Sequence, residues 1–285
     1  MIALVTDSNS QLPDELARRY AITVVPLHVS VDGVDHLEGV DLDADGFYAR
    51  FENGASPTVS TSQPSPGQFA AAYAAAAAAG ADEIVSIHIG SSVSGTCNSA
   101  RLAAAGSPVP VRIVDTGTAS FAVACCVWEA AVALAAEADA DGVVAAAESV
   151  AATVGNVFVV RALSFPRAGG RLAEGADGVP VLSLIAGTMQ PIAQVRSLDE
   201  AADAMAAHIL AAGDGLRVGI GVADRGAAPL WQGLEDRLRG ARSVAELVRY
   251  RIGPSVGAHT GPGTAGAVYY PSTSTISPRM PVSTT

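Results

Sequence analysis

The sequence has few aromatic residues and no long, strongly apolar run. Aromatic residues make up 5% of the 285 positions, whereas hydrophobic residues reach 49%, many of them alanine. Helices rich in such small side chains are expected to pack closely. The longest alanine-rich run, residues 69–81, is shorter than the roughly 20 residues that a membrane-spanning helix needs. We therefore expect a buried helix there and no stable membrane insertion.

Basic residues are also scarce. The chain has 17 Lys and Arg against 28 Asp and Glu, a formal net charge of -11. A protein that binds the phosphate backbone of a nucleic acid needs a basic surface, which this balance cannot easily supply. We expect no nucleic-acid partner.

Cysteine is rare, and its placement does not suit disulfides. The three are Cys97 and the adjacent Cys125 and Cys126. An odd count with two neighbours does not make a disulfide framework, which favours a reducing compartment. The opening MIALVTDSNS lacks a basic region and a long apolar segment of a signal peptide. These features predict a cytoplasmic protein.

What the sequence does contain is an alternation of short apolar runs and helical patterns. Strands are predicted at 2–6, 22–31, 83–89 and 111–114, and helices at 13–20, 43–51, 66–79, 94–105, 119–138 and 142–153. Such alternation predicts a mainly parallel sheet covered by helices.

After residue 156 the pattern becomes richer in strands separated by glycine and proline. Strands are predicted at 157–163, 180–185, 191–195, 217–222, 243–251 and 267–270, and helices at 198–212 and 227–239. The fold class is therefore α/β with two α/β domains, 1–156 with a mainly parallel sheet and 157–271 with a mixed sheet. Residues 272–285 have too little apolar content to pack and are expected to be a disordered tail.

The most informative stretch is VSIHIGSSVSGTCNSAR, residues 85–101. An apolar run breaks at Gly90 into hydroxyl residues, Ser91, Ser92, Ser94 and Thr96, and then enters a helical pattern. The unpaired N–H groups of a helix start favour an anion, either phosphate or carboxylate. Capping of the helix by Ser94 explains the same spacing equally well.

Further polar groups follow the other predicted strands. Asp7-Ser8 and Asp115-Thr116 come at strand ends, and a hydroxyl cluster with Thr61 and Ser62 precedes a helix start at Pro66. In α/β sheets ligands bind beyond the carboxyl ends of the strands. We expect these groups to outline one crevice.

Two motif matches favour plainer interpretations. Residues 41–52, DLDADGFYARFE, have EF-hand spacing, but a strand and turn precede them, so Asp43 is read as a helix N-cap and no metal is expected. Residues 261–266, GPGTAG, match a dinucleotide pattern without room for the βαβ unit that must follow. Tight turns or close backbone approach explain these glycines better.

A serine hydrolase is an alternative function. GSSVS at 90–94 is close to a nucleophile elbow but lacks its second glycine. Ser94 would then be the nucleophile, with His259 brought close by the fold as its base.

Taken in order, eight segments resemble the DegV family of bacterial fatty-acid-binding proteins. They are VTDSNSQLP (5–13), VVPLHVSVDG (24–33), TSQPSPGQF (61–69), SSVSGT (91–96), RIVDT (112–116), GGR (169–171), GTMQPIAQVR (187–196) and GAHTGPGTAG (257–266). Each is weak alone, but their shared order over nearly the whole chain is specific.

The resemblance implies a long-chain fatty acid, of the palmitate, stearate or oleate class, held in an apolar tunnel between two α/β domains. It implies that Thr61, Ser94 and His259 hold the carboxylate, with Ser62, Thr96 and Arg171 as nearby candidates. It further implies a binding subunit, not an enzyme, that needs no cofactor. A separate fatty acid kinase would phosphorylate the presented carboxylate to an acyl phosphate.

Overall fold

The computed structural model describes residues 1–160 and 178–272. By its internal contacts the chain divides into two compact units. The first comprises Met1–Ala152 and Gly253–Ala258, and the second comprises the described parts of Thr153–Ile252 and His259–Thr285. A short segment late in the sequence thus returns to the first unit. The expected domains, 1–156 and 157–271, do not include this return and stay a prediction.

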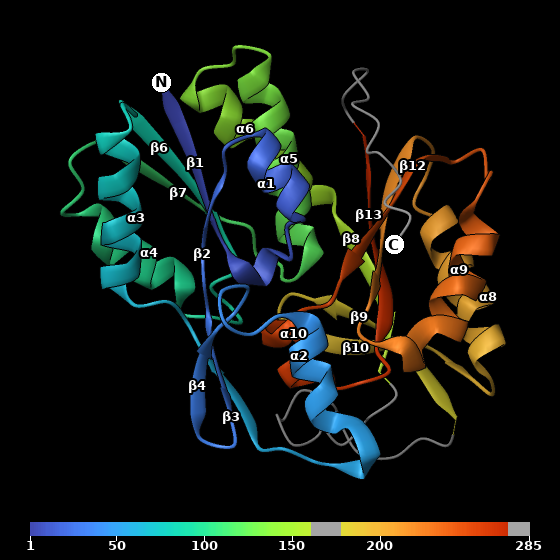
Figure 1. The fold of residues 1–285 in the computed structure, drawn as a ribbon. Coiled ribbons are helices and arrows are strands. Elements are labelled where there is room, and N and C mark those ends of the chain that lie inside the picture. The colour runs from blue at the N-terminus through green and yellow to red at the C-terminus, as the bar shows by residue number, and fades with distance from the viewer. Residues whose placement is uncertain (161–177, 273–285) are drawn as a thin grey trace. The chain divides into compact units, whose positions relative to one another are not determined.

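The first unit is built on a four-stranded parallel sheet, as predicted. Its strands are β1 (Ile2–Asp7), β2 (Thr23–Val25), β6 (Glu83–His88) and β7 (Val111–Asp115), in the order β2-β1-β6-β7. Helices α3 (Pro66–Ala78) and α4 (Thr96–Ala104) cover one face, and α1 (Asp14–Arg19), α5 (Phe121–Ala135) and α6 (Ala140–Thr153) cover the other (Figure 1).

Burial explains why these segments form helices despite weak amphipathic patterns. Phe69 and Tyr73 of α3 pack with Val5 and Ile84 of the sheet, and all four are fully buried. Helix α5 is buried along Phe121–Ala131, so a largely apolar sequence is what its surroundings require. Helix α3 also begins with a capping box from Ser65.

The prediction of one strand over 22–31 is wrong. The segment divides into β2 and β3 (His28–Val31), which belong to different sheets, with Pro26 between them. Proline lacks an N–H group and cannot continue a ladder on both sides. Strand β3 lies between β4 (Val34–Leu37) and β5 (Val59–Ser62) in an antiparallel three-stranded sheet.

Short helices connect the strands of the first unit. They are η1 (Ser8–Ser10), α2 (Ala44–Tyr48) and η2 (Ala49–Gly54). Asp43 accepts a hydrogen bond from the N–H of Gly46, 2.7 Å away, which confirms its role as N-cap of α2. Among the described residues no group of three or more His, Cys, Asp or Glu could hold a metal ion.

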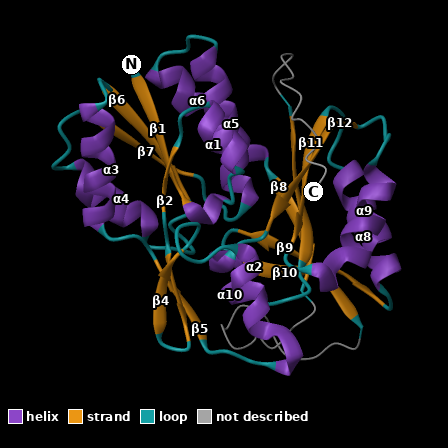
Figure 2. Cartoon of the chain, in the orientation of Figure 1, coloured by secondary structure: helices purple, strands orange, loops and turns teal. Residues whose placement is uncertain are grey.

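The second unit is built on a mixed six-stranded sheet, as predicted. Its strands are β8 (Gly155–Val159), β9 (Val179–Ile185), β10 (Thr188–Val195), β11 (Leu216–Val222), β12 (Val244–Arg251) and β13 (Ala265–Pro271), in the order β10-β9-β8-β13-β11-β12. Only the β11–β12 pair among them is parallel. Its helices are α8 (Leu198–Leu210) and α9 (Ala228–Leu238), with η3 (Arg225–Ala227) before α9 (Figure 2).

The glycine-rich segment before β13 contains a helix that the sequence patterns did not predict. Helix α10 (Pro254–Thr260) is followed by a turn in which Gly261 and Gly263 have positive φ angles. These glycines therefore serve a turn that leads into a strand. A dinucleotide motif would instead follow a strand and open a helix. In the described ranges, 1–160 and 178–272, no helix is long and apolar enough to cross a membrane.

Candidate functional site

Ser94 and Thr96 meet at the start of helix α4. Their hydroxyl oxygens are 2.8 Å apart, and the Thr96 N–H donates to Ser94 Oγ at 3.3 Å. Thr96 is fully buried, whereas Ser94 is half-buried. The nine-residue helix has no side-chain cap at its preceding residue, Gly95. Ser94 thus accepts a hydrogen bond from the first residue of the helix, and its hydroxyl is partly accessible to solvent.

The end of strand β5 lies against the same helix start. An ideal Cβ placed on Gly95 would be 3.0 Å from Nε2 of Gln63, so the Gln63 side chain touches this turn. Thr61 and Ser62 immediately precede Gln63, with Thr61 half-buried and Ser62 exposed. The segment that carries Thr61 and Ser62 thus contacts the turn before α4 through Gln63, and the expected crevice formed by the hydroxyl groups stays a prediction.

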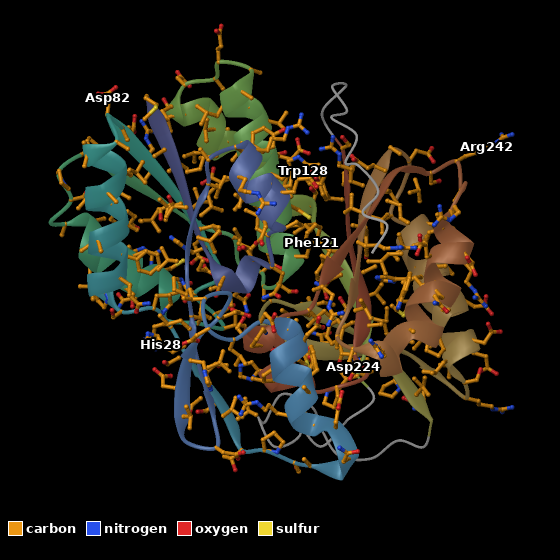
Figure 3. All side chains as sticks on the ribbon, in the orientation of Figure 1. His28, Asp82, Phe121, Trp128, Asp224 and Arg242 are labelled. Atoms are coloured by element: carbon orange, nitrogen blue, oxygen red, sulfur yellow. The ribbon has the colours of Figure 1, made fainter. Side chains whose placement is uncertain are left out.

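A second set of contacts fixes the segment after β5. Gln68 Oε1 accepts from the Ser65 N–H at 2.9 Å and lies 3.0 Å from Nε2 of His28. His28 is the first residue of strand β3 (Figure 3). The other ring nitrogen of His28 is 2.7 Å from Asp35. The hydrogen bonds with Gln68 and Asp35 raise the pKa of His28 above its ordinary value of 6.5.

The loop between β6 and α4 is held by a close approach and a carboxylate. An ideal Cβ on Gly90 would lie 2.6 Å from the carbonyl carbon of Gly117, a distance that only glycine permits. Asp115 Oδ1 accepts from the N–H groups of Ser91 (3.0 Å) and Gly117 (3.1 Å). Burial opposes ionisation of Asp115, but these hydrogen bonds prevail and lower its pKa. The Ser91 N–H thus already has an anionic partner inside the protein.

A buried polar array lies directly behind this loop. Asp7 Oδ2 is 2.9 Å from Nδ1 of His88 and accepts from the Ile89 N–H at 3.1 Å. Nε2 of His88 is 2.6 Å from Ser86 Oγ, which is 2.9 Å from the Tyr73 hydroxyl. All four side chains of this Asp7–His88–Ser86–Tyr73 array are fully buried. It holds the loop start in place, because Ile89 immediately precedes Gly90.

Sequence reasoning treated His88 only as a residue inside a strand and missed this array. A signal was present, since Ser86 and His88 alternate onto one face of the predicted strand. Asp7 directly follows the strand predicted at 2–6, and parallel strands end at the same edge of a sheet. A buried serine, histidine and aspartate resemble a catalytic triad, but in this chain they are sealed in the core.

Two further residues expected to bind the carboxylate, His259 and Arg171, lie outside the described part of the first unit. His259 stands near the end of helix α10 and belongs to the second unit. Arg171 lies outside the described residues. The structure shows contacts between Ser94 and Thr96 and between Gln63 and Gly95, and the roles of Thr61, Ser62, Ser94, Thr96, His259 and Arg171 as carboxylate ligands stay predictions.

The first unit can donate hydrogen bonds to an anion from neutral groups. Ser94 has Thr96 as its hydroxyl partner, and both ring nitrogens of His88 are bonded to Asp7 and Ser86. His88 is therefore not a base for Ser94. Cys97, next in sequence, is no nucleophile either, because burial raises the pKa of its thiol to about 12.

Comparison with known proteins gives a consistent result over nearly the whole chain. The family described as "Uncharacterised protein, DegV family" matches residues 1–272. A DegV domain-containing protein of Streptomyces coelicolor is 36% identical over 275 residues, covering 94% of this chain and 97% of that protein.

Two solved structures share the fold closely. A DegV family protein from Thermus thermophilus, described by its fatty acid binding, is 32% identical with a TM-score of 0.84, covering 95% of this chain and 99% of that one. A protein from Thermotoga maritima, described as revealing a fatty acid binding function, is 26% identical with a TM-score of 0.84 and the same coverage.

Proposed function

Because the chain belongs to the DegV family, we propose that it binds a long-chain fatty acid and presents the carboxylate to a separate fatty acid kinase. The observation that supports the proposal is the packing of Gln63, which follows Thr61 and Ser62, against Gly95, which lies between Ser94 and Thr96. The similarity to the fatty-acid-binding protein of Thermus thermophilus supports it.

In this proposal Thr61, Ser94 and His259 hold the carboxylate, with Ser62 and Thr96 beside them and Arg171 as a further candidate. Neutral hydroxyl donors and the positive end of α4 offset part of the cost of removing a carboxylate from water. They also leave the carboxylate oxygens less tightly clamped than a bidentate arginine would. Such a headgroup site suits a carboxylate that must still accept a phosphoryl group.

Affinity in this scheme comes from the acyl chain. Burying about 14 methylenes at about 0.8 kcal/mol each gains about 11 kcal/mol before the costs of association and ordering. One neutral hydrogen bond at the headgroup contributes about 1 kcal/mol. The palmitate, stearate and oleate class supplies a tail of this length.

The test is whether the chain carries and accepts such a lipid. The full chain is purified, denatured and extracted, and the extract is analysed by mass spectrometry; delipidated protein is then titrated with oleate and, as a control for the headgroup, with methyl oleate. We expect a fatty acid near one equivalent and tighter binding of oleate. No bound fatty acid together with no uptake of oleate would overturn the proposal.

Presentation to a kinase has its own assay. Oleate-loaded protein is incubated with ATP and a fatty acid kinase, and acyl phosphate is trapped with hydroxylamine as the hydroxamate. We expect hydroxamate only when both proteins are present. Hydroxamate from this chain and ATP alone would contradict the assignment as a binding subunit. Turnover of a chromogenic acyl ester that is lost in Ser94→Ala would instead favour the hydrolase alternative.

A further inference from the structure

Glu38, just after strand β4, is a buried carboxylate that joins three segments of the first unit. It is 6% exposed, and the donors that it accepts from are neutral groups of Ser8, Gln11 and Ser255. Ser8 Oγ donates to its Oε2 at 2.5 Å, and the Ser255 N–H donates to its Oε1 at 2.8 Å. A buried carboxylate that is satisfied only by neutral donors depends on all of them.

The segment that Glu38 reaches is the one that returns from late in the sequence. Gly253 packs so closely there that an ideal Cβ would lie 2.8 Å from Glu38 Oε1 and 2.5 Å from Gln11 Oε1. Its N–H donates to Gln11, and Asn9 Nδ2 donates to Ser255 Oγ at 3.2 Å. The first turn of α10 is thus fixed to the loop after β1 by several polar contacts.

A further close contact on the same helix shows how tightly it is held. An ideal Cβ on Gly257 would lie 2.5 Å from the Tyr48 hydroxyl and 2.7 Å from Phe47 Cε1. His259 stands on the same helix, four residues after Ser255. Residues four apart share one helix face, so Ser255 and His259 lie on the same face of α10.

We propose that Glu38 is a positioning residue for fatty-acid binding, because it anchors the first turn of α10 and thereby orients His259. Its effect on the ligand rests on the proposed function, whereas its effect on the helix does not. The carboxylate does not touch the ligand. Its loss releases the helix and weakens recognition of the headgroup while leaving recognition of the tail unchanged.

The first readout concerns the helix alone. Hydrogen exchange of the peptide covering 253–260 is compared in the wild type, Glu38→Ala and Glu38→Gln. We expect faster exchange in Glu38→Ala and near-native exchange in Glu38→Gln, because the amide oxygen can still accept from Ser255 and Ser8 can accept from the amide. Glu148→Gln, an exposed change on α6, is the matched control. Unchanged exchange in Glu38→Ala would overturn the proposal even if the wild type bound no lipid.

The second readout separates positioning from general damage. In delipidated full-length protein, Glu38→Ala is expected to weaken oleate binding about fivefold, the loss of one ordinary hydrogen bond, and to leave methyl oleate binding nearly unchanged. Glu38→Gln should restore oleate binding. In a His259→Ala background Glu38→Ala should have no further effect on oleate. Equal losses for oleate and its ester, or additive losses in the double variant, would overturn the proposal.

If Glu38→Ala does not fold, Gly253→Ala serves the same test, because its added methyl pushes the segment from Gln11 and Glu38 without removing the carboxylate. The same headgroup-selective loss is expected. A wild type that binds neither oleate nor its ester would refute the proposed function, while the exchange data would still decide whether Glu38 anchors the helix.

Discussion

Asp7→Asn is expected to destabilise the first unit by about 2–4 kcal/mol, because it leaves a buried donor without an acceptor. Asp7 Oδ1 accepts from the Asn9 N–H at 3.1 Å, and Oδ2 accepts from the Ile89 N–H at 3.1 Å and faces Nδ1 of His88 at 2.9 Å. The side chain is fully buried, so water cannot replace a lost bond. The substitution is close in shape and changes only hydrogen-bonding capacity.

The magnitude follows from these partners one by one. The amide oxygen of the variant can keep the Asn9 N–H, at a loss of about 1 kcal/mol because the acceptor is no longer charged. The amide nitrogen then faces His88, whose imidazole can present an unprotonated Nδ1 to it, so this bond survives. The Ile89 N–H faces a donor and is left unsatisfied, which costs about 1–3 kcal/mol.

The assay must report on the first unit alone. The chain has two tryptophans; Trp128 is buried in α5 of the first unit, and Trp231 stands on α9 of the second. Urea unfolding is therefore followed by Trp128 fluorescence in a Trp231→Phe background. Asp14→Asn is the matched control. The Asp14 side chain is 92% exposed, and its ion pair with Arg18 is long, at 3.9 Å. Its effect should stay within about 0.5 kcal/mol.

A difference between Asp7→Asn and Asp14→Asn smaller than about 0.5 kcal/mol would refute the reasoning. It would mean that the Ile89 N–H is not held by Asp7 in solution. Hydrogen exchange at Ile89 gives an independent check, because the lost acceptor should make this amide the most affected of the strand end.

Three further outcomes follow from the same geometry. Ser94→Ala should weaken oleate binding by about 1 kcal/mol, or about fivefold in Kd, by titration of delipidated protein; complete loss of binding with an intact fold would contradict tail-dominated affinity. The raised pKa of His28, from hydrogen bonds with Gln68 and Asp35, adds stability below pH 6.5 that is lost as pH rises through the folded value. His28→Asn should therefore reduce the difference in Tm between about pH 5.5 and about pH 8.5, and an unchanged difference would contradict it. Gly90→Ala should cost about 1–3 kcal/mol by urea unfolding, because the added methyl meets backbone that cannot move freely; a neutral effect would show that the loop yields.

The sequence by itself determined the elements that local chemistry specifies. The alternation of apolar runs and helical patterns predicted the parallel sheet of the first unit and the mixed sheet of the second. Asp43 was predicted as an N-cap and is one, because capping depends on residues only three positions apart. The helix predicted at 94–105 is present as Thr96–Ala104, so it begins two residues later than predicted, with Gly95 and not Ser94 at its N-cap.

Only the tertiary structure decided which distant groups meet. The pairing of β3 with β4 and β5, the contact of Gln63 with Gly95, and the return of Gly253–Ala258 to Glu38 join segments far apart in the chain. The same holds for the Asp7–His88–Ser86–Tyr73 array, whose members lie on three elements. Hydrophobic periodicity indicates which face of a segment is buried, but it does not indicate which other segment packs against that face. That partner is chosen by packing and hydrogen bonding of the whole unit, because each buried polar group must find its acceptor or donor somewhere in the folded chain.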